Sequence, residues 1–208
     1  MISIKNLRKS YDDKVLFDNF DLEIPDGSFV VITGESGSGK STLLNMIGGI
    51  EPPDRGTVTV DGFDVTGKGS KREYFRDVVG FLFQNFALLE NKTVRENLEM
   101  IQKAGRSGVE ISDALEKVGL TDVLNKKVYK LSGGEQQRIA LARLMIKKCS
   151  LILADEPTGS LDKRNSDVVM SVLHDLNSQG KTVIIVTHDG EIVNKADNKT
   201  SVLHLGCT

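Results

Sequence analysis

A glycine-rich segment at residues 34–42 has the residue types that bind phosphate. It consists of Gly34-Glu35-Ser36-Gly37-Ser38-Gly39-Lys40-Ser41-Thr42. Glycines allow a tight turn without Cβ atoms, so that backbone N–H groups can point at a bound anion. Lys40 would then reach the β- and γ-phosphates of a nucleotide, and the Ser41 hydroxyl would bind Mg²⁺. The spacing therefore predicts a phosphate-binding loop.

The residues on either side of this segment predict the elements that such a loop needs. An apolar run at 29–33 predicts a buried strand, and residues 43–47 have helical spacing before Gly48 and Gly49. A helix that starts at the loop directs the positive end of its dipole toward the phosphates. A chance match in an ordinary turn is the alternative, but a flanking strand and helix favour the phosphate site.

Two adjacent carboxylates follow a second apolar run, at 151–154. Asp155 suits a position near Mg²⁺, and Glu156 suits a base that polarises water. Neighbouring side chains of a strand point to opposite faces, but a turn at 157–160 could aim both carboxylates into one crevice. An acidic pair at such a place also occurs in turns that have no function.

Gln84 and His188 also stand directly after predicted strands, 78–83 and 182–187. The carboxyl ends of the strands in an α/β sheet face the ligand crevice. Gln84 could therefore hold Mg²⁺ or the attacking water, or it could be a hydrogen-bonding loop residue. His188 could donate to a γ-phosphate, although a lone histidine is more often structural.

A second candidate anion site is Ser132-Gly133-Gly134, which precedes a helix expected over 138–148. Bare backbone donors at the start of a helix bind anions, but Ser-Gly-Gly is also a common loop sequence. Asp162 precedes another expected helix and could simply be its N-cap.

The N-terminal region predicts antiparallel strands. Residues 1–24 alternate between apolar and polar side chains, and Asp12-Asp13 marks a turn. Residues 57–62 predict a further strand that ends in an Asp-Gly turn. Tyr11 lies just before the Asp12-Asp13 turn, where its ring could stack on a base or cover a strand edge.

Residues 93–124 have a helical pattern. Thr93 and Glu96 fit a capping box, and the first helix is expected to run through Met100 and Ile101. A second helix is expected over 111–118. The chain is thus predicted to be an α/β protein with a mostly parallel sheet and an antiparallel β subdomain. A helical subdomain, roughly 86–150, would be inserted in it, and all of 1–208 would form one domain.

Three apolar residues, Phe86, Leu88 and Leu89, fall in an expected loop. Exposed apolar side chains are costly unless something covers them. We interpret the three as a docking surface for another protein; packing within the chain is the alternative.

Composition narrows the function classes. The chain has 208 residues, 39% of them hydrophobic, and a net charge of −2, which gives no general attraction to nucleic acid or anionic lipid. No apolar run approaches the roughly 20 residues that span a bilayer, and the start of the chain does not look like a signal peptide. Cys149 and Cys207 form no metal or disulfide pattern, so a reducing cytosol is expected.

Together, these motifs resemble the ATP-binding subunits of ABC transporters. The resemblance covers essentially the whole chain, and the motifs occur in that family's order. They are the A-loop aromatic (Tyr11), Walker A (Gly34 to Thr42), the Q-loop (Gln84), the signature (Leu131 to Gln137, with Glu135 in place of Gln), Walker B with the catalytic glutamate (Leu151 to Glu156), the D-loop (Ser160 to Asp162) and the H-loop (His188).

The resemblance implies a head-to-tail dimer that binds two ATP molecules at its interface. Catalysis would involve Glu156, His188, Lys40 and Gln84, and Mg²⁺ would be held by Ser41 and Gln84, with Asp155 acting through water. Nucleotide contacts would come from Tyr11 and residues 34–42 of one copy and from Ser132, Gly133 and Gly134 of the other. Asp162 would also contribute a nucleotide contact.

Residues 82–97 and 154–162 resemble the macrolide-exporter and lipoprotein-release branch, and more narrowly the lactococcin-type bacteriocin exporters. This implies a peripheral protein at the cytoplasmic face of the membrane, docked on a separate permease near Phe86, Leu88 and Leu89. The cargo would be a peptide, a bacteriocin or another amphipathic compound. The alternative is an ABC ATPase that drives signalling or remodelling without transport, as in cell division.

Overall fold

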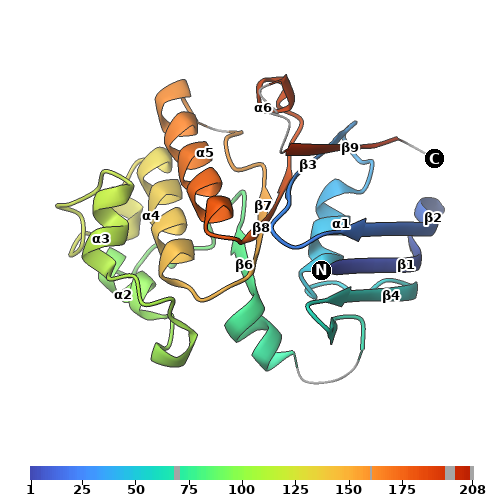
Figure 1. Ribbon diagram of the computed structural model, residues 1–208. Coiled ribbons are helices and arrows are strands. Elements are labelled where there is room, and N and C mark those ends of the chain that lie inside the picture. Colours follow the sequence, from blue (N-terminus) through green and yellow to red (C-terminus); the bar gives the residue numbers. More distant parts are fainter. Residues whose placement is uncertain (68–70, 160, 195–199, 207–208) are drawn as a thin grey trace.

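The computed structural model describes residues 1–67, 71–159, 161–194 and 200–206, and it contains two β-sheets (Figure 1). The first is antiparallel, with strand order β2-β1-β4-β5. Its strands are β1 (Ile2–Tyr11), β2 (Lys14–Ile24), β4 (Arg55–Val60) and β5 (Phe63–Asp64). This is the antiparallel region that the alternating N-terminal pattern predicts.

The second sheet is parallel and has the order β6-β7-β8-β3-β9. Its strands are β3 (Phe29–Gly34), β6 (Val79–Leu82), β7 (Leu151–Asp155), β8 (Thr182–Val186) and β9 (Thr200–Leu205). All of β8 and all of β7 except Asp155 are buried. Parallel strands covered on both faces need continuous apolar runs, which is the pattern that the sequence has at these places.

Helices pack on both faces of the parallel sheet. Helix α1 (Lys40–Ile47) packs with the antiparallel sheet in one core, together with Val30 and Ile32 of β3. The opposite face of β3 presents Phe29 and Val31 to a second core. That core contains residues of α2 (Val94–Glu99), α3 (Ile111–Lys117), α4 (Gly133–Ile146) and α5 (Lys163–Ser178).

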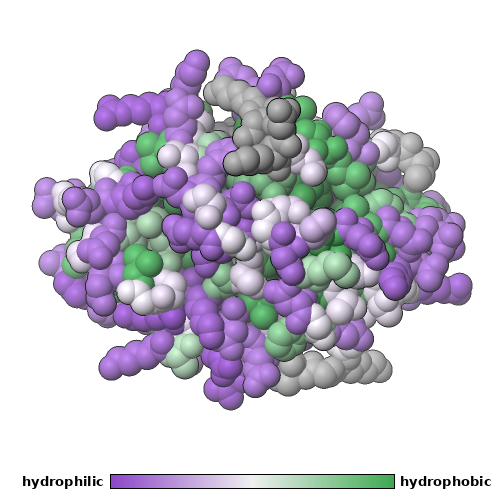
Figure 2. All heavy atoms as spheres, in the orientation of Figure 1, coloured by the Kyte–Doolittle hydropathy of each residue, from purple (hydrophilic) through white to green (hydrophobic). Residues whose placement is uncertain are grey.

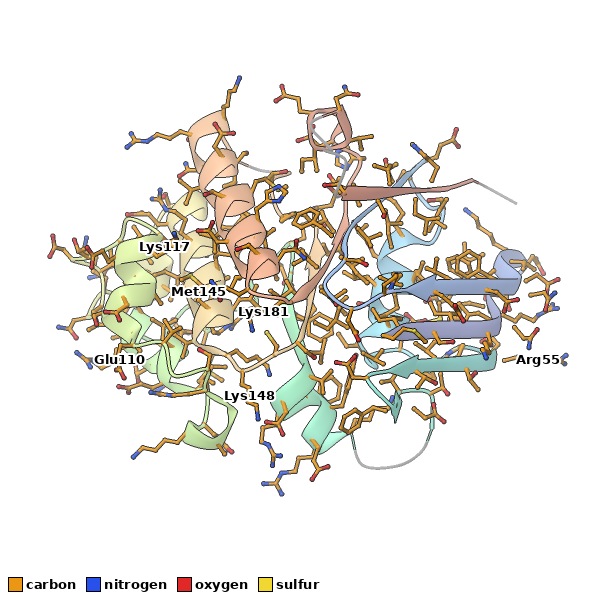
Figure 3. All side chains as sticks on the ribbon, viewed as in Figure 1. Arg55, Glu110, Lys117, Met145, Lys148 and Lys181 are labelled. Atoms are coloured by element: carbon orange, nitrogen blue, oxygen red, sulfur yellow. The ribbon has the colours of Figure 1, made fainter. Side chains whose placement is uncertain are left out.

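Short elements complete the described chain. They are a π-helix (Tyr74–Val78), two 3₁₀ turns (Lys103–Gly105 and Val128–Lys130) and α6 (Gly190–Asn194). Lys117 of α3, labelled in Figure 3, forms a surface ion pair of 2.6 Å with Asp175 of α5. On the face seen in Figure 2, hydrophilic residues predominate over the helices α2 to α5.

Three expected helix boundaries are wrong. Helix α2 ends at Glu99 rather than continuing through Met100 and Ile101. Helix α4 begins at Gly133, five residues before the expected start, and it ends at Ile146 rather than Lys148. Its early start has a local cause, because Ser132 and Glu135 form a capping box that satisfies the first free N–H groups. The Ser-x-x-Glu spacing was available in the sequence.

The remaining expectations concern the two cysteines, Ser160 and membrane-spanning helices. Cys149 is a free, buried cysteine, whereas Cys207 and Ser160 lie outside the described residues. Among the helices of the described part of the chain, none combines the length and apolar character that crossing a bilayer requires.

Candidate nucleotide-binding site

The phosphate-binding loop lies between β3 and α1, as predicted. Gly34 has φ of 150° and Gly39 has φ of 93°, in the region that L side chains rarely adopt. A Cβ on Gly34 would also come within 2.2 Å of the Leu205 carbonyl oxygen of β9. These two glycines are therefore required both by backbone conformation and by space. The turn they allow places residues 35–38 over the N-terminus of α1, where backbone donors face an anion.

Lys40, the first residue of α1, curls back onto this loop. Its buried Nζ donates to the carbonyl oxygens of Gly34 at 2.9 Å and Glu35 at 2.7 Å. The Ser38 hydroxyl is also buried, and no group in the described chain hydrogen-bonds to it. A buried polar group without a partner is uncommon in a folded protein and fits a loop that receives a polar ligand. A phosphate would supply acceptors for both side chains.

Ser41 and Asp155 bring two oxygen ligands together from different elements. The Ser41 Oγ on α1 donates to Asp155 Oδ1 at the end of β7, at 3.0 Å. Burial raises the pKa of Asp155 above its ordinary value of 3.8, and the nearby Glu156 charge adds to the rise, whereas Ser41 and Lys40 oppose it. A nearby cation would offset the cost of the buried charge.

This donor set fits Mg²⁺. Hydroxyl and carboxylate oxygens are the hard ligands that Mg²⁺ prefers, and the ion usually keeps several waters and binds substrate phosphates. No group of three His, Cys, Asp or Glu side chains gathers into a metal site among the described residues. A site of few protein ligands beside a phosphate loop suits Mg²⁺ better than a site that the protein closes entirely.

Glu156 and His188 lie at the carboxyl ends of adjacent strands. Strands β7 and β8 are paired with Asp155 opposite Val186, so that both chains emerge at the same edge of the sheet. Glu156 Oε1 accepts a hydrogen bond from the His188 backbone N–H at 3.1 Å and lies 2.6 Å from His188 Nδ1. Its other oxygen, Oε2, accepts from the Thr187 hydroxyl at 3.0 Å. The carboxylate is thus held in one orientation by the end of β8.

The backbone at Glu156 is also unusual, because its φ is +46°. Left-handed conformations are strained for residues with a Cβ and persist where their surroundings impose them. Here the Glu156 N–H donates to the Val186 carbonyl at 2.8 Å. The conformation turns the chain at the end of β7, so that Asp155 can contact Ser41 while Glu156 contacts β8. This is how two adjacent carboxylates serve one crevice.

Gln84 projects from the same edge. Strand β6 pairs with β7 in a register that sets Leu82 opposite Ala154, and Gln84 follows two residues after the strand ends. Its side chain is exposed. Gln84 therefore extends beyond β6 on the side where Asp155 and Glu156 extend beyond β7.

Tyr11 lies at the end of β1 with an exposed ring. Its hydroxyl donates to Glu51, and the Lys9 ammonium lies 5.0 Å from the ring centroid. Burial and the hydrogen bond to Glu51 raise the pKa of Tyr11. Sequence reasoning did not identify Lys9 or Glu51. Together they hold the ring in place and leave it accessible for stacking.

The second candidate anion site, at Ser132-Gly133-Gly134, forms the start of α4. The Ser132 hydroxyl accepts from the Glu135 N–H at 3.3 Å, and Glu135 Oε2 accepts from the Ser132 N–H at 2.8 Å. The hydrogen bonds that the Ser132 N–H and hydroxyl donate to this carboxylate lower the pKa of Glu135. A Cβ on Gly134 would meet Asn165 Nδ2 at 3.1 Å. Helices α4 and α1 pack into different cores, on opposite faces of the parallel sheet.

Asp162 is the N-cap of α5, as one of the two interpretations predicts. Its Oδ1 accepts from the Asn165 N–H at 2.9 Å, and its Oδ2 accepts from Asn165 Nδ2 at 2.8 Å. Asn165 in turn accepts from Arg138 of α4 at 2.7 Å. The start of α5 is therefore linked to α4. A nucleotide contact from Asp162 stays a prediction.

Comparison with known proteins decides the family. The sequence model described as "ABC transporter" matches residues 17–159, more than half of the chain. This chain belongs to the ABC transporter family. It is 40% identical over 209 residues to the uncharacterized ABC transporter ATP-binding protein YvrO of Bacillus subtilis, with 95% of this chain and 91% of that protein covered.

A longer relative and a solved structure also resemble this ABC protein. It is 38% identical over 206 residues to the macrolide export ATP-binding/permease protein MacB of Campylobacter jejuni, where it covers 32% of that longer protein. Its fold matches a dimeric, post-hydrolysis structure of the ATP-binding cassette MJ0796 bound to ADP and Pi. The match has a TM-score of 0.86 and 35% identity and covers 99% of this chain and 94% of the other. The ABC ATPase fold is thus confirmed, and the chain is an ABC-type ATPase.

The loop after β6 contains contacts in this ABC ATPase that sequence reasoning missed. Asn97 of α2 is fully buried; its Oδ1 accepts from the Leu89 N–H at 2.8 Å, and its Nδ2 donates to the Leu89 carbonyl at 3.1 Å. Leu89 is 49% exposed, whereas Phe86 and Leu88 are half-buried and pack against the core. The apolar loop residues thus divide between the two interpretations. Of the three, only Leu89 is exposed, and the Tyr129 N–H donates to the carbonyl of the adjacent Glu90.

Proposed function

We propose that this chain is the ATP-hydrolysing subunit of an exporter and powers a separate permease from the cytoplasmic face of the membrane. The observation that carries the proposal is the meeting of Lys40, Ser41, Asp155, Glu156 and His188 at one edge of the parallel sheet. The name of the Bacillus relative, an ATP-binding protein of similar length, supports a separate subunit. Macrolide export, in the name of the Campylobacter relative, supports outward transport.

Nucleotide binding requires few changes to the described geometry. Lys40 would exchange its two carbonyl partners for phosphate oxygens, and the Ser38 hydroxyl would gain the partner that it lacks. The exposed face of Tyr11 would stack on the adenine. Mg²⁺, held by Ser41 and Gln84 with Asp155 through water, would offset the charge of the phosphates.

Hydrolysis would use Glu156 as the base. Its carboxylate would accept a proton from the attacking water. To bind that water, the carboxylate would have to lose one of its present side-chain partners, Thr187 or His188. His188 is the residue that can move, because its side chain is 73% exposed. His188 would then donate to the transferred phosphoryl group, while Thr187 continues to orient Glu156.

A second copy of the chain would complete the site. Ser132, Gly133 and Gly134 begin a helix that packs on the opposite face of the sheet from α1. A twofold, head-to-tail pair would place each signature over the other's nucleotide. The dimeric form of MJ0796 supports this arrangement. ATP would close the pair, and hydrolysis would reopen it.

The permease would dock on the loop after β6. The sequence predicts that Phe86, Leu88 and Leu89 contribute, and the exposure of Leu89 supports it as the principal contact. The buried Asn97 binds the Leu89 backbone through two hydrogen bonds. Leu89 would therefore move together with α2, and this movement would be transmitted to the permease. We propose a peptide, a bacteriocin or another amphipathic compound as the cargo.

The test uses the purified chain, alone and reconstituted with its permease. Mg²⁺-dependent release of phosphate from ATP by the chain, and ATP-driven flux of a labelled amphipathic peptide in vesicles with the permease, would support the proposal. ATP hydrolysis without flux, with the permease present, would favour the cell-division type of signalling ATPase. Absence of hydrolysis under all these conditions would refute the proposal.

A further inference from the structure

The loop after β6 contains two successive residues in the left-handed conformation. Phe86 has φ of +61° and Ala87 has φ of +47°, although neither is glycine, asparagine or aspartate. Such a pair is strained and persists only where the surrounding structure imposes it. The loop therefore needs an external support, and that support sets the path of the chain from Gln84 to Leu89.

Arg143 of α4 provides this support. Its Nη1 donates to the Ala87 carbonyl at 2.6 Å, and its Nη2 donates to the Phe86 carbonyl at 2.9 Å. The planar guanidinium thus contacts both left-handed peptide units at once, which a lysine could not do with the same geometry. Figure 3 labels Met145, two residues farther along the same helix.

No carboxylate in the described part of the chain forms an ion pair with Arg143. Burial lowers the pKa of its guanidinium, which shows that the charge is costly where it lies. Arg143 is half-buried, and the two carbonyl oxygens take the place of an ionised partner. An arginine whose charge is partly desolvated, and which binds two backbone carbonyls of the loop, is suited to hold that loop in position.

Gln84 lies within the turn that Arg143 holds. The Phe86 N–H donates to the Phe83 carbonyl at 3.0 Å, so that Gln84 and Asn85 are enclosed by one hydrogen-bonded turn. A shift of the Phe86 carbonyl would therefore move Gln84. Arg143 itself lies on α4, whose first residues form the candidate signature, and α4 is tied to the start of α5 by Arg138.

We propose that Arg143 is a positioning residue that fixes Gln84 against the signature helix, so that Gln84 reaches its Mg²⁺ or water ligand only while α4 is in place. The inference rests on the proposed ATPase function, and in particular on Gln84 as a ligand. Arg143 would thus connect Gln84, which acts on the chain's own nucleotide, to α4, whose first residues act on the nucleotide of the partner copy.

The test is a double-mutant cycle between Arg143→Met and Gln84→Ala, measured as kcat, KM for ATP and the Mg²⁺ concentration for half-maximal activity. Arg143→Met is expected to lower kcat by about 10- to 100-fold, because small displacements of a catalytic group have effects of that size. It should raise the Mg²⁺ requirement as Gln84→Ala does and leave KM for ATP within about threefold. The double variant should be no worse than Gln84→Ala, because both changes remove one function.

Two controls separate positioning from general stability. Arg95→Met removes an exposed arginine of α2, which lies 3.7 Å from Glu99, and should leave all three constants unchanged. Arg143→Lys keeps the charge and one donor and should recover part of kcat and of the Mg²⁺ response. If Arg143→Met does not fold, the same cycle is measured with Arg143→Lys.

Two results would overturn the inference. One is an additive cycle, in which Arg143→Met lowers kcat as much in the Gln84→Ala background as in the parent. The other is an unchanged Mg²⁺ requirement in either single variant. Both results leave the ATPase proposal intact, because the parent chain would still hydrolyse ATP; only an inactive parent would refute the proposed function.

Discussion

At the scale of single residues, the site depends on side chains whose partners come from other elements. Glu156 is oriented by Thr187 and His188 of a neighbouring strand end, and Lys40 occupies the loop that would hold phosphate. A single substitution at either residue should therefore affect one step, turnover for Glu156 and nucleotide binding for Lys40.

Glu156→Gln should abolish turnover but preserve ATP binding. The amide keeps the size of the carboxylate but cannot accept the proton of water, so we expect a loss of about 10²- to 10⁴-fold in kcat. Because hydrolysis reopens the pair, the variant should also accumulate as a dimer with ATP, which size-exclusion chromatography with light scattering would detect. Normal turnover by a monomeric variant would contradict the assigned base.

Lys40→Ala should weaken nucleotide binding. The ammonium forms charge-assisted hydrogen bonds, worth about 1.5–3 kcal/mol each, so we expect about a tenfold or greater loss in affinity for ATP. Fluorescence titration with a labelled ATP analogue measures this loss, and Lys5→Ala, an exposed lysine of β1, is the control. Equal affinities of Lys40→Ala and the parent would exclude the phosphate-binding loop as the site.

At the scale of elements, the start of α2 supports the loop that carries Leu89. The capping box joins Thr93 and Glu96, and Asn97 one residue later holds Leu89. Hydrogen bonds from Thr93, and the nearby Lys92, lower the pKa of Glu96 from 4.5 to about 2. The carboxylate therefore favours folding when ionised.

This pKa shift predicts a pH-dependent stability difference. A lowered pKa in the folded chain adds stability above the ordinary value of 4.5, and that stability is lost as the pH falls toward about 2. Glu96→Ala should therefore lower Tm most near pH 7, and the difference from the parent should narrow as the pH falls from 4.5 to about 2. Thermal melts followed by circular dichroism at several pH values test it. A difference that stays constant from pH 7 down to about pH 2 would show that the charge of Glu96 contributes nothing.

Leu89→Asp should separate ATP hydrolysis from transport. Leu89 is exposed and its backbone is held by Asn97, so a charge there should not disturb the fold, unlike a charge at half-buried Phe86 or Leu88. We expect hydrolysis by the isolated subunit to stay within about twofold of the parent, because exposed substitutions have small effects on stability. Flux with the permease should fall strongly. Met100→Asp, another exposed apolar residue, is the control, and full flux by Leu89→Asp would place the docking surface elsewhere.

At the scale of the whole molecule, α1 and α4 pack on opposite faces of one sheet. A twofold pair is the simplest arrangement that brings the start of α4 to a phosphate-binding loop. With Ser36→Cys and Ser132→Cys in the Glu156→Gln background, we expect oxidation to produce a disulfide-linked dimer with ATP and Mg²⁺, and little dimer with ADP. Each single-cysteine variant is the control. Equal cross-linking with and without ATP would contradict nucleotide-driven closure.

The sequence alone determined the chemistry of the site and most elements around it. Short-range signals sufficed for the phosphate-binding loop, the buried strands, the Thr93 cap and the turn at Asp61 and Gly62, because glycine conformation, side-chain period and capping act over a few residues. The same signals predicted where Asp155, Glu156 and His188 fall along the chain. The boundary of α4 could also have been predicted, from the spacing of Ser132 and Glu135.

Only the tertiary structure decided which side chains meet. The contacts of Ser41 with Asp155, of Glu156 with Thr187 and of Arg143 with the loop after β6 join residues 114, 31 and 56 or 57 positions apart. Such contacts depend on strand order, on register and on which face of the sheet each helix covers. The left-handed backbone at Phe86, Ala87 and Glu156 depends on the same packing, because the chain adopts a strained conformation only where distant elements hold it there.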